Sequence, residues 1–121
     1  MDPENTETSR STPVRLLQEQ VDLWIRSVGV RYFNELTNTA ILAEEVGEVA
    51  RIMARRYGEQ SFKEGEEDVD LGEELSDVLF VVLCLAEQTG TDLQTAWDRK
   101  MQLRTDRDAS RHSGNPELRR S

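Results

Sequence analysis

The stretch LAEEVGEVARIMARRYG, residues 42–58, reads as helix throughout and carries acids where the helix should meet its core. Glu45 and Glu48 are three residues apart and therefore share one face of the helix. Ile41 and Ile52 extend the same row in both directions. Burying this row would place two carboxylates among apolar side chains, and an unpaired buried charge is very costly. The pattern therefore predicts that a cation compensates for these acids.

A second acidic pair repeats the pattern on the next predicted helix, residues 71–89. Glu74 and Asp77 are also three residues apart, and their row continues through the apolar Val81. Two antiparallel neighbouring helices would bring the pairs face to face, with Glu44 beside the first pair. Ligands that are all oxygen favour a hard cation such as Mg²⁺ or Mn²⁺. An open site of this kind suits phosphoryl chemistry.

A plainer interpretation of the acids is a solvated helix face, since E-x-x-E occurs by chance in many Glu-rich amphipathic helices. Two pairs on successive helices, both within apolar rows, favour a site instead. An EF-hand is excluded because residues 66–74 lack the ligand spacing of that loop. A di-iron carboxylate bundle is disfavoured because it needs Glu-x-x-His on its helices, and the only histidine is His112.

The rest of the chain favours further helices, and we expect an all-α fold with four helices. Thr12 and Pro13 are typical of a helix start, with a hydroxyl cap and a proline in the first turn. From there apolar residues, Trp24 among them, recur at intervals of three and four until near Gly29. A connector over residues 30–35 leads into the second helix.

We expect the second helix over residues 36–57, closed by Gly58. Asp70 is expected to cap the third helix, and Thr91 to cap a fourth helix that ends near Arg107. The predicted segments are a disordered tail over residues 1–11, a helical domain over 12–108, a mobile surface loop over 58–70 and a flexible basic tail over 109–121.

Composition limits the protein to one domain and excludes several partners. The chain has 121 residues, enough for one hydrophobic core. Its formal net charge of −9 repels nucleic acids and anionic membranes, so we expect neither as a partner. The longest apolar run, residues 78–86, is too short to span a membrane. It contains the only cysteine, Cys84, which we expect to be a small buried hydrophobe in a reducing cytoplasm.

The third helix is apolar nearly all round between residues 78 and 85. A helix of that kind is either central to a fold or lies at a subunit interface. One short subunit offers few partners for such a helix, so we expect a homo-oligomer, at least a dimer.

The segments EEVGEVAR and DLGEELSDVLFVVLCLA resemble the MazG-type nucleoside triphosphate pyrophosphohydrolases, in particular the short single-domain bacterial proteins. The family motif is E-E-x-x-E, a variable spacer and E-x-x-D. This resemblance implies a helical dimer or dimer of dimers with its active site near the subunit interface. It also implies Mg²⁺-dependent cleavage of (deoxy)nucleoside triphosphates between the α- and β-phosphates, giving the monophosphate and pyrophosphate. The role it implies is removal of non-standard or excess nucleotides.

The resemblance also implies roles for individual residues. Glu45, Glu48, Glu74 and Asp77 would hold the metal, and Glu44 would be a further ligand or would orient the attacking water. Relatives place base contacts near Phe33 and Asn34, whereas some have an asparagine near the position of Arg104. The cations that we expect to contact the triphosphate lie on the fourth helix and the tail, namely Lys100, Arg104, Arg107 and Arg111.

Two other functions remain open from the sequence. The acidic faces would suit a non-enzymatic helical module that binds a basic partner. They would also suit a hydrolase or binder of another phosphorylated metabolite, such as a phosphoribosyl compound, because helical relatives with similar acidic motifs act on such substrates.

Overall fold

The computed structural model describes residues 12–59, 69–113 and 117 of the chain. The expected disordered tail over residues 1–11, most of the expected loop over 58–70 and parts of the tail beyond 113 lie outside the described residues. Within the described part, the chain forms four α-helices and one π-helical turn, with no strand. The all-α prediction is therefore confirmed.

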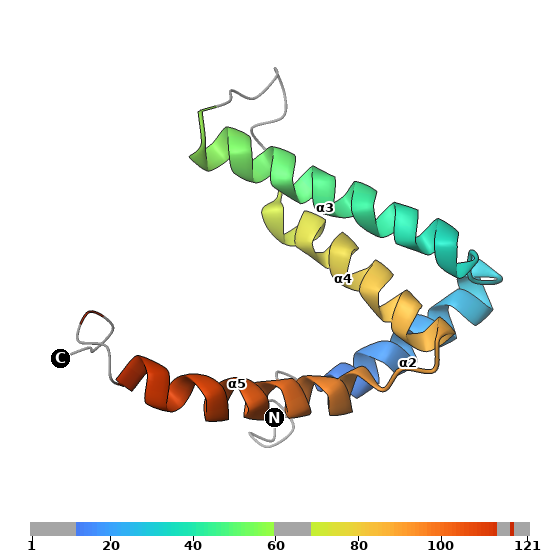
Figure 1. Cartoon of the computed structure of the whole chain (residues 1–121). Coiled ribbons are helices and arrows are strands. Elements are labelled where there is room, and N and C mark those ends of the chain that lie inside the picture. The colour runs from blue at the N-terminus through green and yellow to red at the C-terminus, as the bar shows by residue number, and fades with distance from the viewer. Residues whose placement is uncertain (1–11, 60–68, 114–116, 118–121) are drawn as a thin grey trace, which may run out of the picture.

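The elements follow one another in the order α2, η1, α3, α4 and α5 (Figure 1). Their bounds are Val14–Trp24, Ile25–Gly29, Glu35–Tyr57, Leu71–Gln88 and Leu93–Ser113. Helix α4 packs along α3 in the opposite direction, and α2 packs against both α4 and α5. The neighbouring antiparallel helices that the acidic motif requires are thus present.

The two helices that carry the acids begin with side-chain caps. Asn34 caps α3 by accepting a hydrogen bond from the backbone N–H of Thr37 at 2.8 Å. Asp70 caps α4 as predicted, accepting from the N–H of Gly72 at 2.7 Å. These caps satisfy N–H groups that have no partner inside the helix, and they fix where each helix begins. The register of the two acidic pairs follows from these starting points.

The first helix differs from the prediction at both ends. Pro13, rather than Thr12, is the N-cap residue, and its carbonyl accepts from the N–H groups of Leu16 and Leu17. After Trp24 the chain widens into the π-helical turn η1 instead of continuing as a regular helix. The wider pitch changes the direction of the side chains within η1, where Val28 is 65% exposed.

The last helix also starts and ends differently from the prediction. Its cap is Asp92, which accepts from the backbone N–H of Thr95 at 3.1 Å and from the Thr95 hydroxyl at 2.8 Å. Thr91, the predicted cap, instead hydrogen-bonds with the hydroxyl of Thr89. Helix α5 runs to Ser113, beyond the end expected near Arg107. Residues 109–113, which the sequence assigned to the tail, are therefore helical.

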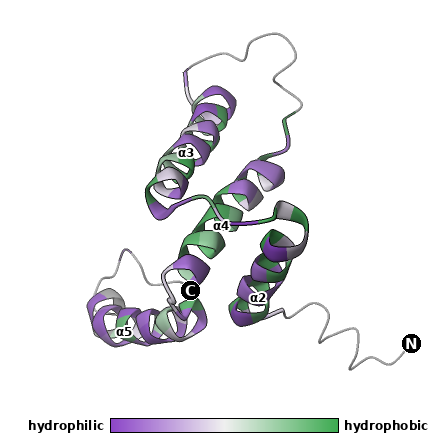
Figure 2. Ribbon diagram, turned by 90° about the vertical axis from the view of Figure 1, so that its right-hand side faces the viewer, coloured by the Kyte–Doolittle hydropathy of each residue, from purple (hydrophilic) through white to green (hydrophobic). Residues whose placement is uncertain are grey.

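The core lies where α2, η1 and α4 meet. Its buried residues are Val21, Ile25, Leu83 and Cys84. Cys84 is only 3% exposed, which confirms its expected burial. Figure 2 shows α4 as the most hydrophobic helix, whereas α5 is largely hydrophilic. Within the described residues, no helix combines the length and hydropathy that crossing a bilayer requires.

A buried glutamine joins α2 to the turn between α4 and α5. Gln18 is 6% exposed, and its amide donates to the carbonyl of Thr91 at 2.9 Å and to the Glu87 carboxylate at 3.2 Å. Its carbonyl oxygen accepts from the N–H of Leu93 at 2.8 Å. Because each of these polar groups gains a partner, the buried amide fixes the start of α5 against α2.

Candidate active site

The acidic motif comes together where α3 passes α4. Glu45 on α3 and Glu74 and Asp77 on α4 each offer a carboxylate oxygen, and these oxygens all lie within 4.8 Å of one another. Glu45 and Glu74 are partly buried, and Asp77 is exposed. Three of the five predicted acids thus form one cluster, which is accessible to solvent on one side.

Electrostatics in the cluster favour a bound cation. Burial raises the pKa of the Glu45 carboxyl above its ordinary value, and the charges of Asp77, Glu74, Glu48 and Glu44 raise it further. Each of these effects disfavours the ionised carboxylate. A divalent cation reverses that balance because it offsets the crowded negative charge. The all-oxygen donor set of the cluster fits a hard ion such as Mg²⁺.

The other two acids of the motif flank the cluster. Glu48 is exposed, and its carboxylate Oε2 pairs with Nη2 of Arg51 at 2.7 Å. Arg51 thus reaches back one helical turn to Glu48. Glu44 is exposed on the neighbouring face of α3. Both still lie close enough to raise the pKa of Glu45.

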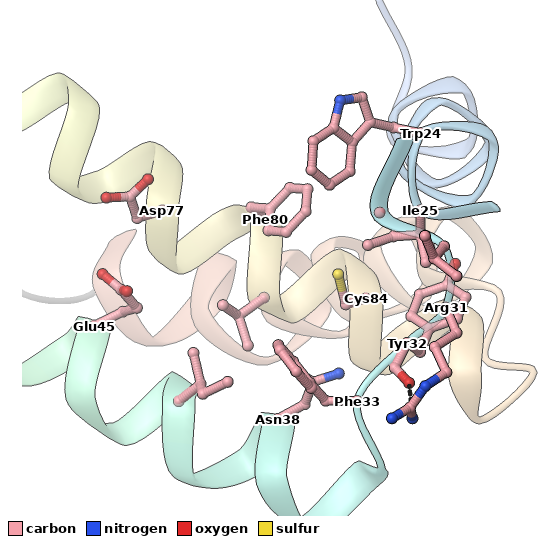
Figure 3. A pocket seen from close by; sticks show the side chains of 14 residues that line it. Trp24, Ile25, Arg31, Tyr32, Phe33, Asn38, Glu45, Asp77, Phe80 and Cys84 are labelled. Atoms are coloured by element: carbon pink, nitrogen blue, oxygen red, sulfur yellow. Dashed lines mark hydrogen bonds between the residues drawn. The ribbon is translucent and has the colours of Figure 1, made fainter. Parts of the chain in front are cut away.

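A cavity of about 580 Å³ opens beside the carboxylates. Glu45 and Asp77 line one end, and Trp24, Phe33 and Phe80 lie toward the other (Figure 3). Trp24 and Phe80 meet edge to face, with ring centroids 5.8 Å apart. This volume suits a small organic molecule. The cavity therefore joins a carboxylate end to an aromatic end.

The remaining lining residues come from η1, from the connector that follows it, from the first turns of α3 and from α4. They are Ile25, Gly29, Val30, Arg31, Tyr32, Asn38, Ile41, Val81 and Cys84. Val30 has a backbone φ of 75°, a conformation that a β-branched residue rarely adopts. Such strain persists only where the surrounding structure enforces it.

Tyr32 is anchored to α2 by a strong hydrogen bond. Its hydroxyl donates to Oδ1 of Asp22 at 2.6 Å, and Arg26 forms an ion pair with the same carboxylate at 3.0 Å. The Tyr32 hydrogen bond is the main cause that lowers the pKa of Asp22, although burial opposes it. Burial and the Asp22 carboxylate raise the pKa of Tyr32 well above its ordinary value.

The predicted substrate residues divide into two groups. Phe33 lines the cavity with its side chain 58% exposed, whereas Asn34 caps α3 and does not line it. The predicted phosphate-binding cations lie on α5, which packs against α2, and none of them lines the cavity of the described subunit. These residues are Lys100, Arg104, Arg107 and Arg111, and the last two pair with Asp108.

Sequence reasoning missed several lining residues. Asn38 and Ile41 precede Glu45 by seven and four positions, so they lie on its face of α3, and Phe80 follows Asp77 by three on α4. The same spacing rule that paired the acids would have found all three. Trp24 was expected in the core, yet it is 47% exposed and lines the cavity.

Comparisons with known proteins identify the family of the chain. Residues 33–112 match the MazG nucleotide pyrophosphohydrolase domain. The YpjD protein of Bacillus subtilis strain 168 is 42% identical over 95 residues, which cover 78% of this chain and 86% of YpjD. The crystal structure of YpjD from Bacillus subtilis matches with a TM-score of 0.67 at 40% identity, covering 76% of this chain and 94% of that chain.

A second solved structure is that of a Bacillus-conserved MazG protein, a nucleotide pyrophosphohydrolase. It matches with a TM-score of 0.63 at 35% identity and covers 76% of this chain and 88% of that chain. The matched region over residues 33–112 contains all five acids of the motif. The chain therefore belongs to the MazG nucleotide pyrophosphohydrolase family, whose members are hydrolases that act on phosphoanhydride bonds.

Proposed function

We propose that the protein hydrolyses nucleoside triphosphates or deoxynucleoside triphosphates between the α- and β-phosphates, releasing the monophosphate and pyrophosphate. The observation that carries this proposal is the cavity, which is lined at one end by Glu45 and Asp77, two of the three clustered carboxylates, and at the other by aromatic rings. A nucleotide has the same polarity, with anionic phosphates at one end and a flat apolar base at the other. The solved relative that is a nucleotide pyrophosphohydrolase supports the same reaction.

Mg²⁺ is the proposed cofactor, and Mn²⁺ is a chemically reasonable substitute because both prefer oxygen ligands. Glu45, Glu74 and Asp77 would hold the ion, and Glu48 would join them when it leaves Arg51. Bound there, the ion would neutralise phosphate charge and lower the pKa of a coordinated water. Glu44 would orient the attacking water or accept its proton. Because the chain is so acidic, phosphates approach the site only with a cation.

The aromatic end of the cavity would hold the base. Trp24 and Phe80 meet edge to face and leave ring surface toward the cavity, and Phe33 lies across from them. Stacking on aromatic rings depends little on which base is bound, and this suits an enzyme that removes several different nucleotides from the pool. Removal of excess or non-standard nucleotides is therefore the role that we propose.

A homo-oligomer, as a dimer or a tetramer, is part of the proposal. Trp24, Leu79 and Phe80 border a second hollow between α2 and α4, and Leu75 lies one turn from Leu79. These four side chains, here the α2–α4 patch, are each between 38% and 50% exposed. A second copy that covered the patch would bury apolar surface beside the cavity. It would also provide a route for the basic residues of α5 to reach the phosphates of a neighbouring subunit.

The deciding experiment measures pyrophosphate release from a panel of canonical and modified ribo- and deoxyribonucleoside triphosphates, with Mg²⁺, with Mn²⁺ and with a chelator. We expect cation-dependent release from at least one nucleotide. Asp77→Asn should abolish this turnover while its helical circular dichroism stays unchanged. Wild-type activity in this variant would refute the site.

The panel also separates the competing functions. Phosphoribosyl compounds are included, and exclusive turnover of these would favour the metabolite hydrolase. Absence of turnover on every compound, together with no thermal stabilisation by either cation, would favour a helical interaction module.

A further inference from the structure

Residues 30–34 form a cavity wall in which Tyr32 packs against the core, whereas its neighbours Val30, Arg31 and Phe33 are exposed. Val30, Arg31, Tyr32 and Phe33 all line the cavity. Yet Val30 is 79% exposed and Phe33 is 58% exposed, so little apolar surface is buried to fix them. The strained φ of Val30 also requires an external restraint. Tyr32 is held through Asp22, but Phe33 needs a separate anchor.

That anchor is a chain of two amide side chains that ends on the Phe33 backbone. Nε2 of Gln88, the last residue of α4, donates to the carbonyl of Phe33. Oε1 of Gln88 accepts from Nδ2 of Asn38 on α3 at 2.7 Å. Asn38 is 6% exposed and itself lines the cavity.

The polarity of this chain follows from its final acceptor. A carbonyl can only accept, so Gln88 must direct its NH₂ group at Phe33. Its oxygen is then left to accept, and Asn38 must direct its own NH₂ group at that oxygen. One backbone carbonyl therefore orients both amides, and loss of the Gln88 side chain removes both links at once.

The two amides link the cavity wall to both α3 and α4. Asn38 lies on the same face of α3 as Glu45, and both are labelled in Figure 3. Gln88 is the last residue of α4, the helix that carries Asp77. The wall over residues 30–34 is thus tied to both helices that carry the carboxylates. Residues 30–32 precede the region matched to the family, so the wall is largely outside that match.

We propose that Gln88 and Asn38 are positioning residues that hold the Phe33 wall at a fixed distance from the carboxylates and so determine how tightly the base of a substrate binds. This inference rests on the proposed nucleotide pyrophosphohydrolase function. Neither side chain acts on the phosphates. Loosening the wall should weaken binding of the base and leave the chemical step at the carboxylates nearly unchanged.

The test compares Gln88→Met, Asn38→Leu and the double variant, which are neutral and close in size to the originals. The control is Gln102→Met on α5, whose amide donates only to Asp106 at 2.9 Å and does not line the cavity. For the best nucleotide of the panel, we expect KM to rise about tenfold in each single variant, the effect of losing one such hydrogen bond, with kcat within about twofold. The double variant should raise KM no further than Gln88→Met, because the two amides act as one chain. The control should match the wild type.

A second readout does not need activity. Amide hydrogen exchange in the segment that carries Phe33 should speed up in Gln88→Met, in the absence of nucleotide, and should not change in Gln102→Met. Unchanged exchange would overturn the proposal. So would an unchanged KM, a loss confined to kcat, or single-variant effects that multiply in the double variant.

The outcomes also separate this inference from the proposed function. If the wild type hydrolyses nucleotides and Gln88→Met keeps its KM, only the positioning role fails. If the wild type hydrolyses no nucleotide, the proposed function fails and base positioning fails with it, whatever the exchange rates are. If Asn38→Leu does not fold, Gln88→Met alone decides, since Gln88 lies at a helix end and is not fully buried.

Discussion

Glu45 is placed by α3 within a few ångströms of two other carboxylates, and burial adds to the cost of its charge. The metal-free protein therefore carries electrostatic repulsion that serves binding and opposes stability. Active sites commonly store free energy in this way. The apolar residues around the acids, such as Ile41 and Ile52, compensate by holding the helices together; Ile52 is fully buried.

We predict that Glu45→Gln raises the thermal unfolding midpoint of the metal-free protein at pH 7, by roughly 4 °C for each kcal/mol of repulsion removed. The same variant should lose the stabilisation that Mg²⁺ gives the wild type. That stabilisation would be about 1.4 kcal/mol at a free Mg²⁺ concentration ten times the Kd. Thermal melts in chelator and in millimolar Mg²⁺ measure both effects. Glu19→Gln, an exposed acid on α2, is the control and should keep the Mg²⁺ response. A lower midpoint for Glu45→Gln in chelator would contradict this account.

The Tyr32–Asp22 hydrogen bond makes a second residue-scale prediction, on pH. The pKa of Asp22 in the folded protein lies below its ordinary value of 3.8, mainly because Tyr32 donates to the carboxylate. The stabilisation is therefore fully present above pH 3.8 and is lost as the pH falls through the lower, folded pKa. Tyr32→Phe should thus lower the free energy of unfolding near neutral pH and have a smaller effect in acid.

Urea denaturation of the wild type and Tyr32→Phe between acid and neutral pH tests this prediction. The difference between their free energies of unfolding should shrink as the pH falls below 3.8. Tyr57→Phe is the control, because Tyr57 is 70% exposed on α3. A difference that stays constant with pH would mean that the contribution of the Tyr32 hydroxyl does not depend on the charge of Asp22, which would contradict the prediction.

At the scale of elements, helices with local start signals were predicted well and the others were not. The start of α4 was predicted from its cap, Asp70, whereas the start of α3 was predicted within one residue without recognising Asn34 as its cap. The end of α5 was predicted six residues too early, although Gly114 and Pro116 follow Ser113 as ordinary stop signals. The turn η1 has no comparable local signal, because a change from α- to π-helical pitch depends on packing.

The cap of α5 yields a prediction at this scale. Asp92 accepts two hydrogen bonds from Thr95, while Thr91 faces Thr89. Asp92→Ala should therefore lower the free energy of unfolding, because the first turn of α5 loses its N-cap. Thr91→Ala should cost less, and urea denaturation at neutral pH compares the two. A larger loss of unfolding free energy in Thr91→Ala than in Asp92→Ala would mean that Thr91 is the cap, as the sequence suggested.

At the scale of the whole molecule, the site divides into a part that sequence reasoning reached and a part that it did not. The carboxylates were predictable because helical spacing places Glu45, Glu74 and Asp77 on facing rows. The aromatic end was not, because Trp24 reaches the cavity only after α2 packs on α4. Apolar periodicity identifies the row of Trp24 but cannot distinguish a core from a cavity wall.

Apolar periodicity is equally ambiguous for the α2–α4 patch. It predicts that these side chains are buried, but they are exposed in a single subunit. Leu79 is 44% exposed and borders the hollow between α2 and α4, but it does not line the cavity. If a second copy covers the patch, a charge at this position must be buried without a partner, which is costly. Leu79→Lys should therefore dissociate the oligomer.

Light scattering at micromolar concentration measures the mass of the wild type and of Leu79→Lys, and circular dichroism checks that the helices remain. The control is Leu36→Lys on α3, which is 84% exposed and lies outside the patch. We expect a dimer or a tetramer for the wild type and the control, and a smaller species for Leu79→Lys. A monomeric wild type would refute the oligomer, and an unchanged mass for Leu79→Lys would move the interface away from this patch. If the basic residues of α5 serve a neighbouring subunit, Leu79→Lys should also raise KM, because dissociation removes the cations that balance the phosphates.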